Sequence, residues 1–256
     1  MVFFRIDDLK SQMETPSMLS KLLHEDLTFN YLTNISLKYN FILFDNPKTG
    51  STSLKTALHD VELGRLVKYF DDGAHPPVFG SPFVKPFQLS WEYFNKILRS
   101  TSFVKFCVVR NPYTRALSCF NSNLRPNNKQ RDFFYKRYKL DQGYEVSFKE
   151  YLTYLYNDRE KYINPHSAHW AIQSDLLLFD KINYDYVFKF EEFDKIIDVI
   201  NKNIFKRDII EHKHLGAITK ANERLHDFYD ADSVELVQKI YQKDFDNFDY
   251  SLTLEL

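Results

Sequence analysis

Short apolar runs and helical patterns alternate along the middle of the chain. Phe41 to Phe44 is a continuous apolar run that predicts a buried strand, and from Ser51 to His59 the apolar residues share one helix face. The same order recurs from Phe103 to Val109 and from Tyr113 to Ser122. Strands that alternate with helices in this way predict an α/β fold, a P-loop-like parallel sheet flanked by helices.

The remaining segments extend this pattern. Further elements are predicted as strands at residues 66–70 and 186–190, and as helices at residues 91–98, 151–156, 191–203 and 232–244. Residues 1–38 are expected to be helical in part, and residues 71–88, which contain several prolines and glycines, predict an irregular connection. Because no repeat or linker interrupts the chain, we expect one domain over residues 1–256, with its motif-bearing core at about residues 41–250.

The charge balance narrows the class of partner. The 256 residues carry 34 Lys and Arg against 35 Asp and Glu, which argues against a general binder of nucleic acid or of a membrane surface. No apolar run approaches the ~20 residues of a membrane helix, so no membrane span is expected. Cys107 and Cys119 are too few for a disulfide framework and have no zinc-binding spacing. Free thiols and the absence of a signal peptide predict a cytoplasmic protein.

The loop after the first apolar run combines a lysine, a glycine and several hydroxyl groups at a helix N-terminus. Such an end offers backbone N–H groups and a positive dipole to an anion, and the glycine allows the backbone to approach it closely. The candidate residues are Pro47, Lys48, Thr49, Gly50, Ser51, Thr52 and Ser53. An ordinary capped turn is the alternative. The loop differs from the nucleotide P-loop, because the first glycine is absent and the lysine precedes the remaining one.

A second loop follows the next predicted buried strand. Arg110 stands at the end of that strand, and Ser118 lies in the helix that follows. An arginine fork and a serine hydroxyl can converge on one phosphate, although a structural arginine beside an unrelated serine would give the same pattern. Ligands of parallel sheets bind at the carboxyl ends of strands. The two loops together therefore favour a nucleotide that bears phosphates at both ends.

These two loops resemble the donor-binding motifs of sulfotransferases that use 3′-phosphoadenosine 5′-phosphosulfate (PAPS). They read P-K-T-G-S-T-S from Pro47 and R-N-P-Y-T-R-A-L-S from Arg110. The double-arginine form of the second motif is most similar to the carbohydrate sulfotransferase branch. The segment H-W-A-I-Q from His169, residues 184–191 and residues 241–250 are similar to the same branch. The resemblance covers about residues 41–250.

The resemblance implies in-line transfer of a sulfonate group from PAPS to an acceptor hydroxyl, in a step that requires no metal. In that branch, the resemblance implies that the acceptor is a glycan. It implies that residues 47–53 hold the 5′-phosphosulfate and that Lys48 stabilises charge on the leaving phosphate. It also implies that Arg110 and Ser118 hold the 3′-phosphate. Asp45 departs from the apolar strand end of the relatives, and we expect it to pair with Lys48 or with a loop hydroxyl.

The acceptor hydroxyl must lose a proton as it attacks sulfur, which requires a base. By the resemblance, His75 on the connection between the two motifs is the first candidate, and His169 is the second. Glu191, at the end of a predicted strand, is a candidate support for the phosphosulfate loop.

Other function classes stay open at this point. A nucleotide-dependent kinase would need a magnesium ion held by carboxylates, and a non-catalytic module would bind PAPS or its product PAP (adenosine 3′,5′-bisphosphate) without transferring anything. Residues 125–139 interleave six basic with four aromatic side chains. They form either a solvated helix face or a flap over an anionic acceptor or the donor.

Overall fold

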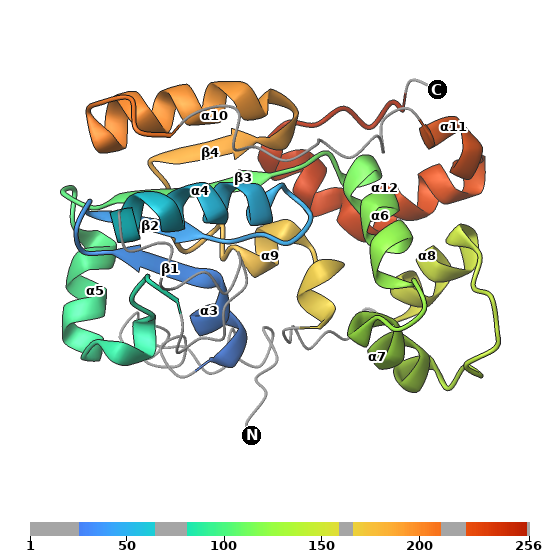
Figure 1. Cartoon of the computed structure of the whole chain (residues 1–256). Coiled ribbons are helices and arrows are strands. Elements are labelled where there is room, and N and C mark those ends of the chain that lie inside the picture. The colour runs from blue at the N-terminus through green and yellow to red at the C-terminus, as the bar shows by residue number, and fades with distance from the viewer. Residues whose placement is uncertain (1–25, 65–80, 159–165, 211–223, 255–256) are drawn as a thin grey trace.

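The structure, a computed structural model, describes residues 26–64, 81–158, 166–210 and 224–254. A four-stranded sheet carries helices on both faces and continues at one end into a lobe of helices (Figure 1). The strands lie in the order β1-β2-β3-β4. Their bounds are Thr33–Ser36 for β1, Phe41–Phe44 for β2, Val104–Val109 for β3 and Tyr186–Lys189 for β4. Because β2, β3 and β4 run parallel with helical crossovers, the predicted α/β fold is confirmed.

The edge strand β1 is a difference from the prediction. It pairs antiparallel with β2, with Thr33 opposite Phe44, so the sheet is mixed and not wholly parallel. All four of its residues are buried although only Ile35 is a large apolar residue. Tertiary burial and not apolar periodicity therefore defines this strand. The strand predicted at residues 66–70 lies outside the described residues.

Most of the predicted helices begin and end near their expected positions. The helices are α3 (Leu27–Leu32), α4 (Ser51–Leu63), α5 (Trp91–Arg99), α6 (Pro112–Asn123), α7 (Lys129–Tyr138), α8 (Phe148–Asn157), α9 (Gln173–Leu176), α10 (Phe193–Val199), α11 (Leu225–Phe228) and α12 (Ala231–Phe248). The structure thus adds helices that were not predicted, such as α9 and α11. Shorter helical turns are η3 (Pro86–Gln88), η4 (Ser167–His169), η5 (Phe190–Glu192) and the π-helical η6 (Ile200–Phe205). The helix predicted over residues 191–203 is thus divided among η5, α10 and η6.

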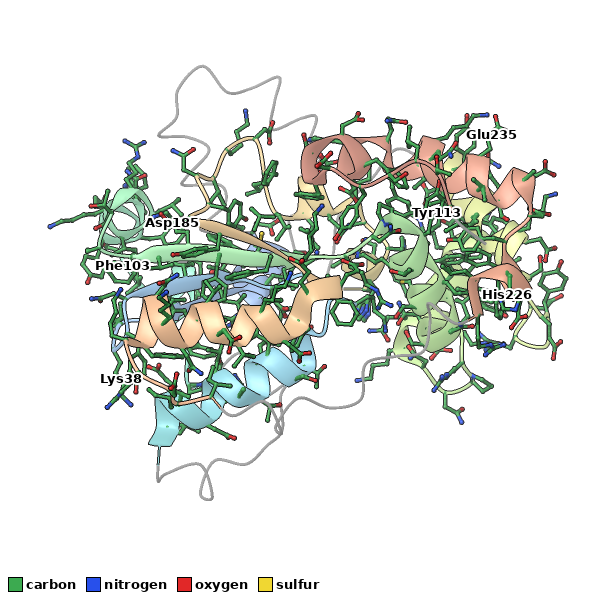
Figure 2. The ribbon with its side chains drawn as sticks, turned by 90° about the horizontal axis from the view of Figure 1, so that it is seen from above. Lys38, Phe103, Tyr113, Asp185, His226 and Glu235 are labelled. Carbon is green, nitrogen blue, oxygen red and sulfur yellow. The ribbon has the colours of Figure 1, made fainter. Side chains whose placement is uncertain are left out.

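The two faces of the sheet build two separate cores, because successive side chains of a strand point to opposite sides. Phe41 and Leu43 of β2 face α4 and α10, which lie on the same side of the sheet (Figure 2). Ile42 and Phe44 face the opposite side, where α3, α5 and the end of α12 pack. The predicted inward residues Leu54, Ala57 and Leu58 of α4 and Phe193, Ile196, Ile197 and Ile200 of the later helix are all buried.

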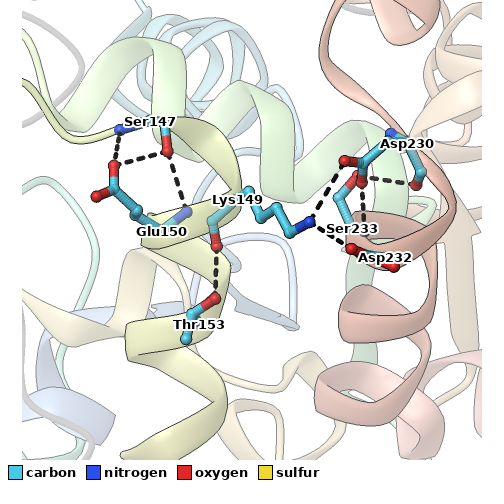
Figure 3. Close-up of polar contacts among 7 residues, drawn as sticks. All are labelled: Ser147, Lys149, Glu150, Thr153, Asp230, Asp232 and Ser233. Carbon is cyan, nitrogen blue, oxygen red and sulfur yellow. Dashed lines mark hydrogen bonds and ion pairs between the residues drawn. The ribbon is translucent and has the colours of Figure 1, made fainter.

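The helical lobe forms around α6, which starts at the end of β3. Its core includes Tyr113 and Leu117 of α6, Tyr151 of α8 and Tyr241 of α12. Figure 2 shows Tyr113 on α6, where this helix leaves the sheet for the lobe. At the surface, Lys149 of α8 forms ion pairs with Asp230 and Asp232 at the start of α12 (Figure 3). The lobe is therefore joined to the sheet by the same helix that follows the second candidate loop.

Candidate functional site

The two candidate loops leave neighbouring strands at the same edge of the sheet. Phe44, the last residue of β2, pairs with Cys107 of β3, and the loops lead into α4 and α6. The guanidinium Nη1 of Arg110 donates a hydrogen bond of 3.0 Å to the carbonyl oxygen of Lys48. The structure therefore brings the two predicted motifs into direct contact.

Gly50 gives the first loop a shape that no other residue could adopt without strain. Its φ of 74° and ψ of 16° lie in the left-handed region. A Cβ atom here would lie 2.8 Å from Phe193 Cε2 and 2.9 Å from Phe190 Cε2. Within the described residues no side chain caps α4, and the first N–H groups of a helix have no acceptor inside it. The start of α4, at residues 51–53, thus offers N–H donors to an anion.

Pro47 and Thr49 use their polar groups to hold the loop in shape. The hydroxyl of Thr49 donates to the carbonyl oxygen of Asn46 at 2.7 Å, and Arg115 Nε donates to the carbonyl oxygen of Pro47 at 3.2 Å. The amide of Asn46 donates in turn to the carbonyl oxygen of Val108, in β3, at 2.9 Å. These hydrogen bonds fix the first loop to β3 and to the second motif.

Asp45 does not pair as the sequence led us to expect. Its carboxylate lies 2.6 Å from Lys55 Nζ, and both side chains are buried. The expected pairing of Asp45 with Lys48 or a loop hydroxyl is therefore wrong. Lys55 lies on the inner side of α4, one helical turn after Ser51, where its long side chain reaches the strand end. This ion pair joins α4 to the end of β2 and leaves Lys48 without a competing carboxylate from Asp45.

Lys48 extends from the first loop toward α6. Its φ of 74° is positive, which is uncommon outside glycine, and its ammonium donates a hydrogen bond to the Ser122 hydroxyl. Burial lowers the pKa of Lys48; Cys119 opposes this shift, and neighbouring arginines, including Arg110, reinforce it. A cation that is half enclosed beside other cations is a favourable partner for a bound anion.

Arg110 is enclosed between the two loops. Its Nε donates to the Thr114 hydroxyl at 3.0 Å, and its guanidinium carbon lies 4.5 Å from the centre of the Phe190 ring. Burial lowers the pKa of Arg110 to about 10, and Glu191 opposes that shift. The group therefore carries its full charge at neutral pH. The same Phe190 ring packs against Gly50, so one aromatic residue supports both loops.

Ser118 lies on α6, one helical turn before Ser122. Residues four apart on a helix share a face, so Ser118 lies on the face of α6 that contacts Lys48. It is 8% exposed. Arg115, between the two loops, donates to the carbonyl oxygens of Ala171 at 2.7 Å and Ala168 at 3.3 Å. The second arginine of the motif is therefore buried against residues 168–171, and both arginines contact the first loop, Arg115 at Pro47 and Arg110 at Lys48.

Of the two candidate bases, the structure describes only His169. His75 lies outside the described residues. His169 ends η4, and its carbonyl oxygen accepts from Cys119 Sγ of α6 at 3.1 Å. Its ring Nε2 lies 3.3 Å from Gln130 Nε2 of α7. The structure thus places His169 beside α6 and α7, near the helix that carries Ser118.

Glu191 supports the second loop and not the first. Its Oε1 accepts from the backbone N–H of Asn111 at 2.9 Å, and its Oε2 accepts from the Tyr250 hydroxyl at 2.8 Å. The expected support of the phosphosulfate loop by Glu191 is not found among the described contacts. The C-terminal segment, through Tyr250, instead steadies the residue that follows Arg110.

Sequence reasoning missed the residue that links both loops. Gln173 is fully buried; its Oε1 accepts from Asn46 Nδ2 at 2.8 Å and from the backbone N–H of Arg110 at 3.0 Å. Its Nε2 donates to the carbonyl oxygen of Arg110 at 2.8 Å. The backbone N–H of Gln173 donates to Asp244 of α12 at 2.9 Å. Gln173 ends the H-W-A-I-Q segment, so the motif was visible, but its contacts depend on the fold.

The basic and aromatic residues of the segment 125–139 are divided between core and surface. Phe134 and Tyr135 of α7 are buried, and Arg131 lies over the Tyr135 ring at 3.9 Å. Arg137 pairs with Asp158. Three lysines of the segment are exposed: Lys129, Lys136 and Lys139. A helix with one solvated face is therefore present, and its role toward a ligand stays a prediction.

The described residues contain neither a metal-binding cluster nor a membrane-spanning helix. No cluster of three or more His, Cys, Asp or Glu side chains that could hold a metal ion occurs among them. Nor does any helix in this part of the chain have the length and apolar character needed to cross a membrane.

The geometry agrees with what comparison with known proteins shows. Residues 32–251 match the model of the sulfotransferase family, so the chain belongs to this family. It is 24% identical to carbohydrate sulfotransferase 11 of Rattus norvegicus and of Mus musculus over 173 residues, 60% of this chain and 49% of each relative. It is also 24% identical to carbohydrate sulfotransferase 12 of Mus musculus over 135 residues, 43% of this chain and 32% of the relative. The chain thus spans about half or less of these curated relatives. No solved structure matches it significantly.

Proposed function

We propose that the protein transfers a sulfonate group from PAPS to a hydroxyl group of a carbohydrate. The observation that carries the proposal is the contact between two anion-binding loops on adjacent strands, made by Arg110 and the Lys48 carbonyl oxygen at 3.0 Å. Membership of the sulfotransferase family supports the reaction class. The carbohydrate sulfotransferases among the relatives support the acceptor class.

The first loop fits the 5′-phosphosulfate end of the donor. Gly50 leaves no room for a side chain next to Phe190 and Phe193, and so keeps the backbone at the start of α4 open to an anion. The N–H groups at residues 51–53 and the hydroxyls of Ser51, Thr52 and Ser53 supply donors there. Pro47 and Thr49 serve this site by shaping the loop, because their polar groups bond within it.

Arg110 and Ser118 form the second half of the donor site in this proposal. Arg110 stands where the second loop begins, and Ser118 follows on the face of α6 that reaches Lys48 through Ser122. A 3′-phosphate bound here would meet a charged guanidinium and a hydroxyl donor. Two anion sites on one edge of a sheet distinguish PAPS from a nucleotide that carries phosphate only at its 5′ end.

Charge develops on the 5′-phosphate when the S–O bond breaks, and Lys48 is placed to stabilise it. The acceptor oxygen forms the new bond to sulfur, and its proton passes to a base. Positioned ammonium and N–H donors can stabilise this charge, which is smaller than that of phosphoryl transfer, and the proposal therefore includes no metal. A cytoplasmic location stays a prediction.

Donor binding tests the site assignment. We expect Lys48→Ala and Arg110→Ala each to weaken PAP binding at least about tenfold, since each removes a charged partner of a phosphate. Isothermal titration measures this, and Lys96→Ala, which changes an exposed lysine of α5, is the matched control. Unchanged affinity in both site variants would contradict the assignment. Transfer of radiolabelled sulfonate from PAPS to a panel of glycans, peptides and small alcohols then separates an enzyme from a module that only binds.

The proposed base is His75, with His169 as the alternative. If His75 accepts the proton, His75→Ala keeps PAP affinity within about twofold but lowers turnover about a hundredfold or more, because general-base catalysis commonly contributes that much. The measurement is kcat with PAP affinity determined in parallel. If His75→Ala retains turnover while His169→Ala loses it, the role belongs to His169.

A further inference from the structure

The side-chain amide of Gln173 lies between the two candidate loops, next to the residues that follow β2 and β3. Gln173 Oε1 accepts from Asn46 Nδ2 at 2.8 Å and from the Arg110 N–H at 3.0 Å, while its Nε2 donates to the Arg110 carbonyl oxygen at 2.8 Å. Asn46 directly precedes the first motif, and Arg110 begins the second. The side chain thus connects the two motifs from a third segment of the chain.

Gln173 is itself held from the far side. The carboxylate of Asp244, in α12, accepts from the Gln173 N–H at 2.9 Å, from the Ser174 N–H at 2.7 Å and from the Ser174 hydroxyl at 2.8 Å. These N–H groups start the short helix α9, whose own preceding residue provides no side-chain cap. Asp244 therefore caps α9 from another helix and fixes the backbone from which the Gln173 amide projects.

The whole network is removed from water. Gln173, Ser174 and Asp244 are each 0% exposed, and Asn46 is 1% exposed. Hydrogen bonds in such surroundings are costly to leave unmade, because a buried group without a partner keeps its full desolvation penalty. The distance between the start of the first loop and the start of the second is therefore strongly constrained.

This constraint has a specific meaning for a ligand with two anionic ends. Binding both ends at once gains affinity only if the two subsites are correctly spaced, and the gain is lost when geometry prevents simultaneous contact. A change in the spacing of the two subsites should leave the affinity for a ligand with one phosphate largely intact. It should reduce the affinity that a second phosphate adds.

We propose, on the basis of the function proposed above, that Gln173 is a positioning residue that sets the spacing between the 5′ and 3′ phosphate subsites. It thereby determines how strongly the protein prefers a nucleotide with a 3′-phosphate. Gln173 contacts the loops and not the donor, and Asp244 acts through Gln173. The preference for the 3′-phosphate then depends on the hydrogen bonds of Gln173 with Asn46 and Asp244 as well as on Arg110 and Ser118.

The test compares two ligands on each variant. Isothermal titration gives the dissociation constants of PAP and of AMP, which lacks the 3′-phosphate, and the ratio of the AMP constant to the PAP constant reports the benefit of that phosphate. Gln173→Met keeps the side-chain length but removes the amide. We expect this variant to lower the ratio about tenfold, mainly through weaker PAP binding, which is the scale of one charge-assisted contact.

A matched glutamine provides the control. Gln238 of α12 donates to the Tyr113 hydroxyl at 3.0 Å and to the Leu252 carbonyl oxygen at 2.9 Å, and neither partner belongs to the residues proposed to bind the donor. Gln238→Met should leave the ratio within about twofold of the wild type. Adenosine 2′,5′-bisphosphate is the second control, because its extra phosphate is misplaced and should bring no comparable gain.

The outcomes separate this proposal from the proposed function. If the wild type binds PAP no more tightly than AMP, the donor-site proposal fails before Gln173 is considered. If the wild type prefers PAP and Gln173→Met weakens both ligands equally, Gln173 is only structural and the positioning proposal is wrong. Should Gln173→Met not fold, Asp244→Asn retains the glutamine but disturbs its cap. This variant must also lower the ratio, and an unchanged ratio in it overturns the proposal.

Discussion

At the scale of single residues, Gly50 determines whether the first loop can form. Its backbone is left-handed, and the two phenylalanines next to it leave no space for a Cβ atom. One of them, Phe190, also carries the Arg110 guanidinium on its ring. A side chain at position 50 would therefore displace a residue that supports both halves of the site.

We expect Gly50→Ala to lower the free energy of unfolding by about 2 kcal/mol, from left-handed backbone strain and overpacking together. It should also weaken PAP binding, because Phe190 must move. Chemical denaturation and titration calorimetry measure the two effects. Gly64→Ala is the matched control, since Gly64 also has a positive φ but a Cβ there meets nothing within 4 Å. It should lose stability and keep its PAP affinity; an unchanged affinity in Gly50→Ala contradicts the expectation.

Residue patterns can nominate candidate residues, but they do not show which side chains those residues contact. Lys48, Gly50 and Arg110 were recognisable because they stand in the loops directly after buried strands, and Ser118 because it lies in the helix that follows. That Asp45 pairs with Lys55 and not with Lys48 could not be read from spacing. The reason is physical: a lysine side chain is long, and only the path of α4 decides which carboxylate it reaches.

At the scale of elements, some helices are defined by their own sequence and others by contacts with distant segments. The helix α8 is defined by its own sequence: the Ser147 hydroxyl accepts from the Glu150 N–H, and the Glu150 carboxylate accepts from the Ser147 N–H at 2.8 Å (Figure 3). In contrast, α9 has four residues and receives its cap from Asp244, far away in sequence. The helix α8 was therefore predictable from the sequence, and α9 was not.

The cap of α8 supports a prediction on stability. Ser147→Ala removes the acceptor for the Glu150 N–H and should lower the free energy of unfolding by about 1 kcal/mol. Lys149→Ala, which removes only the exposed ion pairs with Asp230 and Asp232, is the comparison and should have a smaller effect that diminishes with added salt. Urea denaturation at low and high salt measures both. A larger loss for Lys149→Ala than for Ser147→Ala would contradict this ranking.

At the scale of the whole molecule, the site exists because three distant segments meet. The first loop follows β2 and the second follows β3, while Gln173 reaches them from the chain between the lobe and β4. Asp244 then joins this junction to α12 and so to the helical lobe. The lobe therefore contributes to the geometry of the loops through contacts that lie outside both motifs.

The sequence by itself determined the α/β class, the two strand-loop-helix units and the residues of both loops. These features depend on local periodicity, capping and the residue types that an anion requires, all of which operate over a few neighbouring positions. Tertiary structure alone decided the edge strand β1, the partner of Asp45, the contact of Glu191 with the second loop and the contacts of Gln173 with both loops. Each of these depends on which segments the burial of the core brings together, and the energy of a buried hydrogen bond or ion pair arises only after that burial.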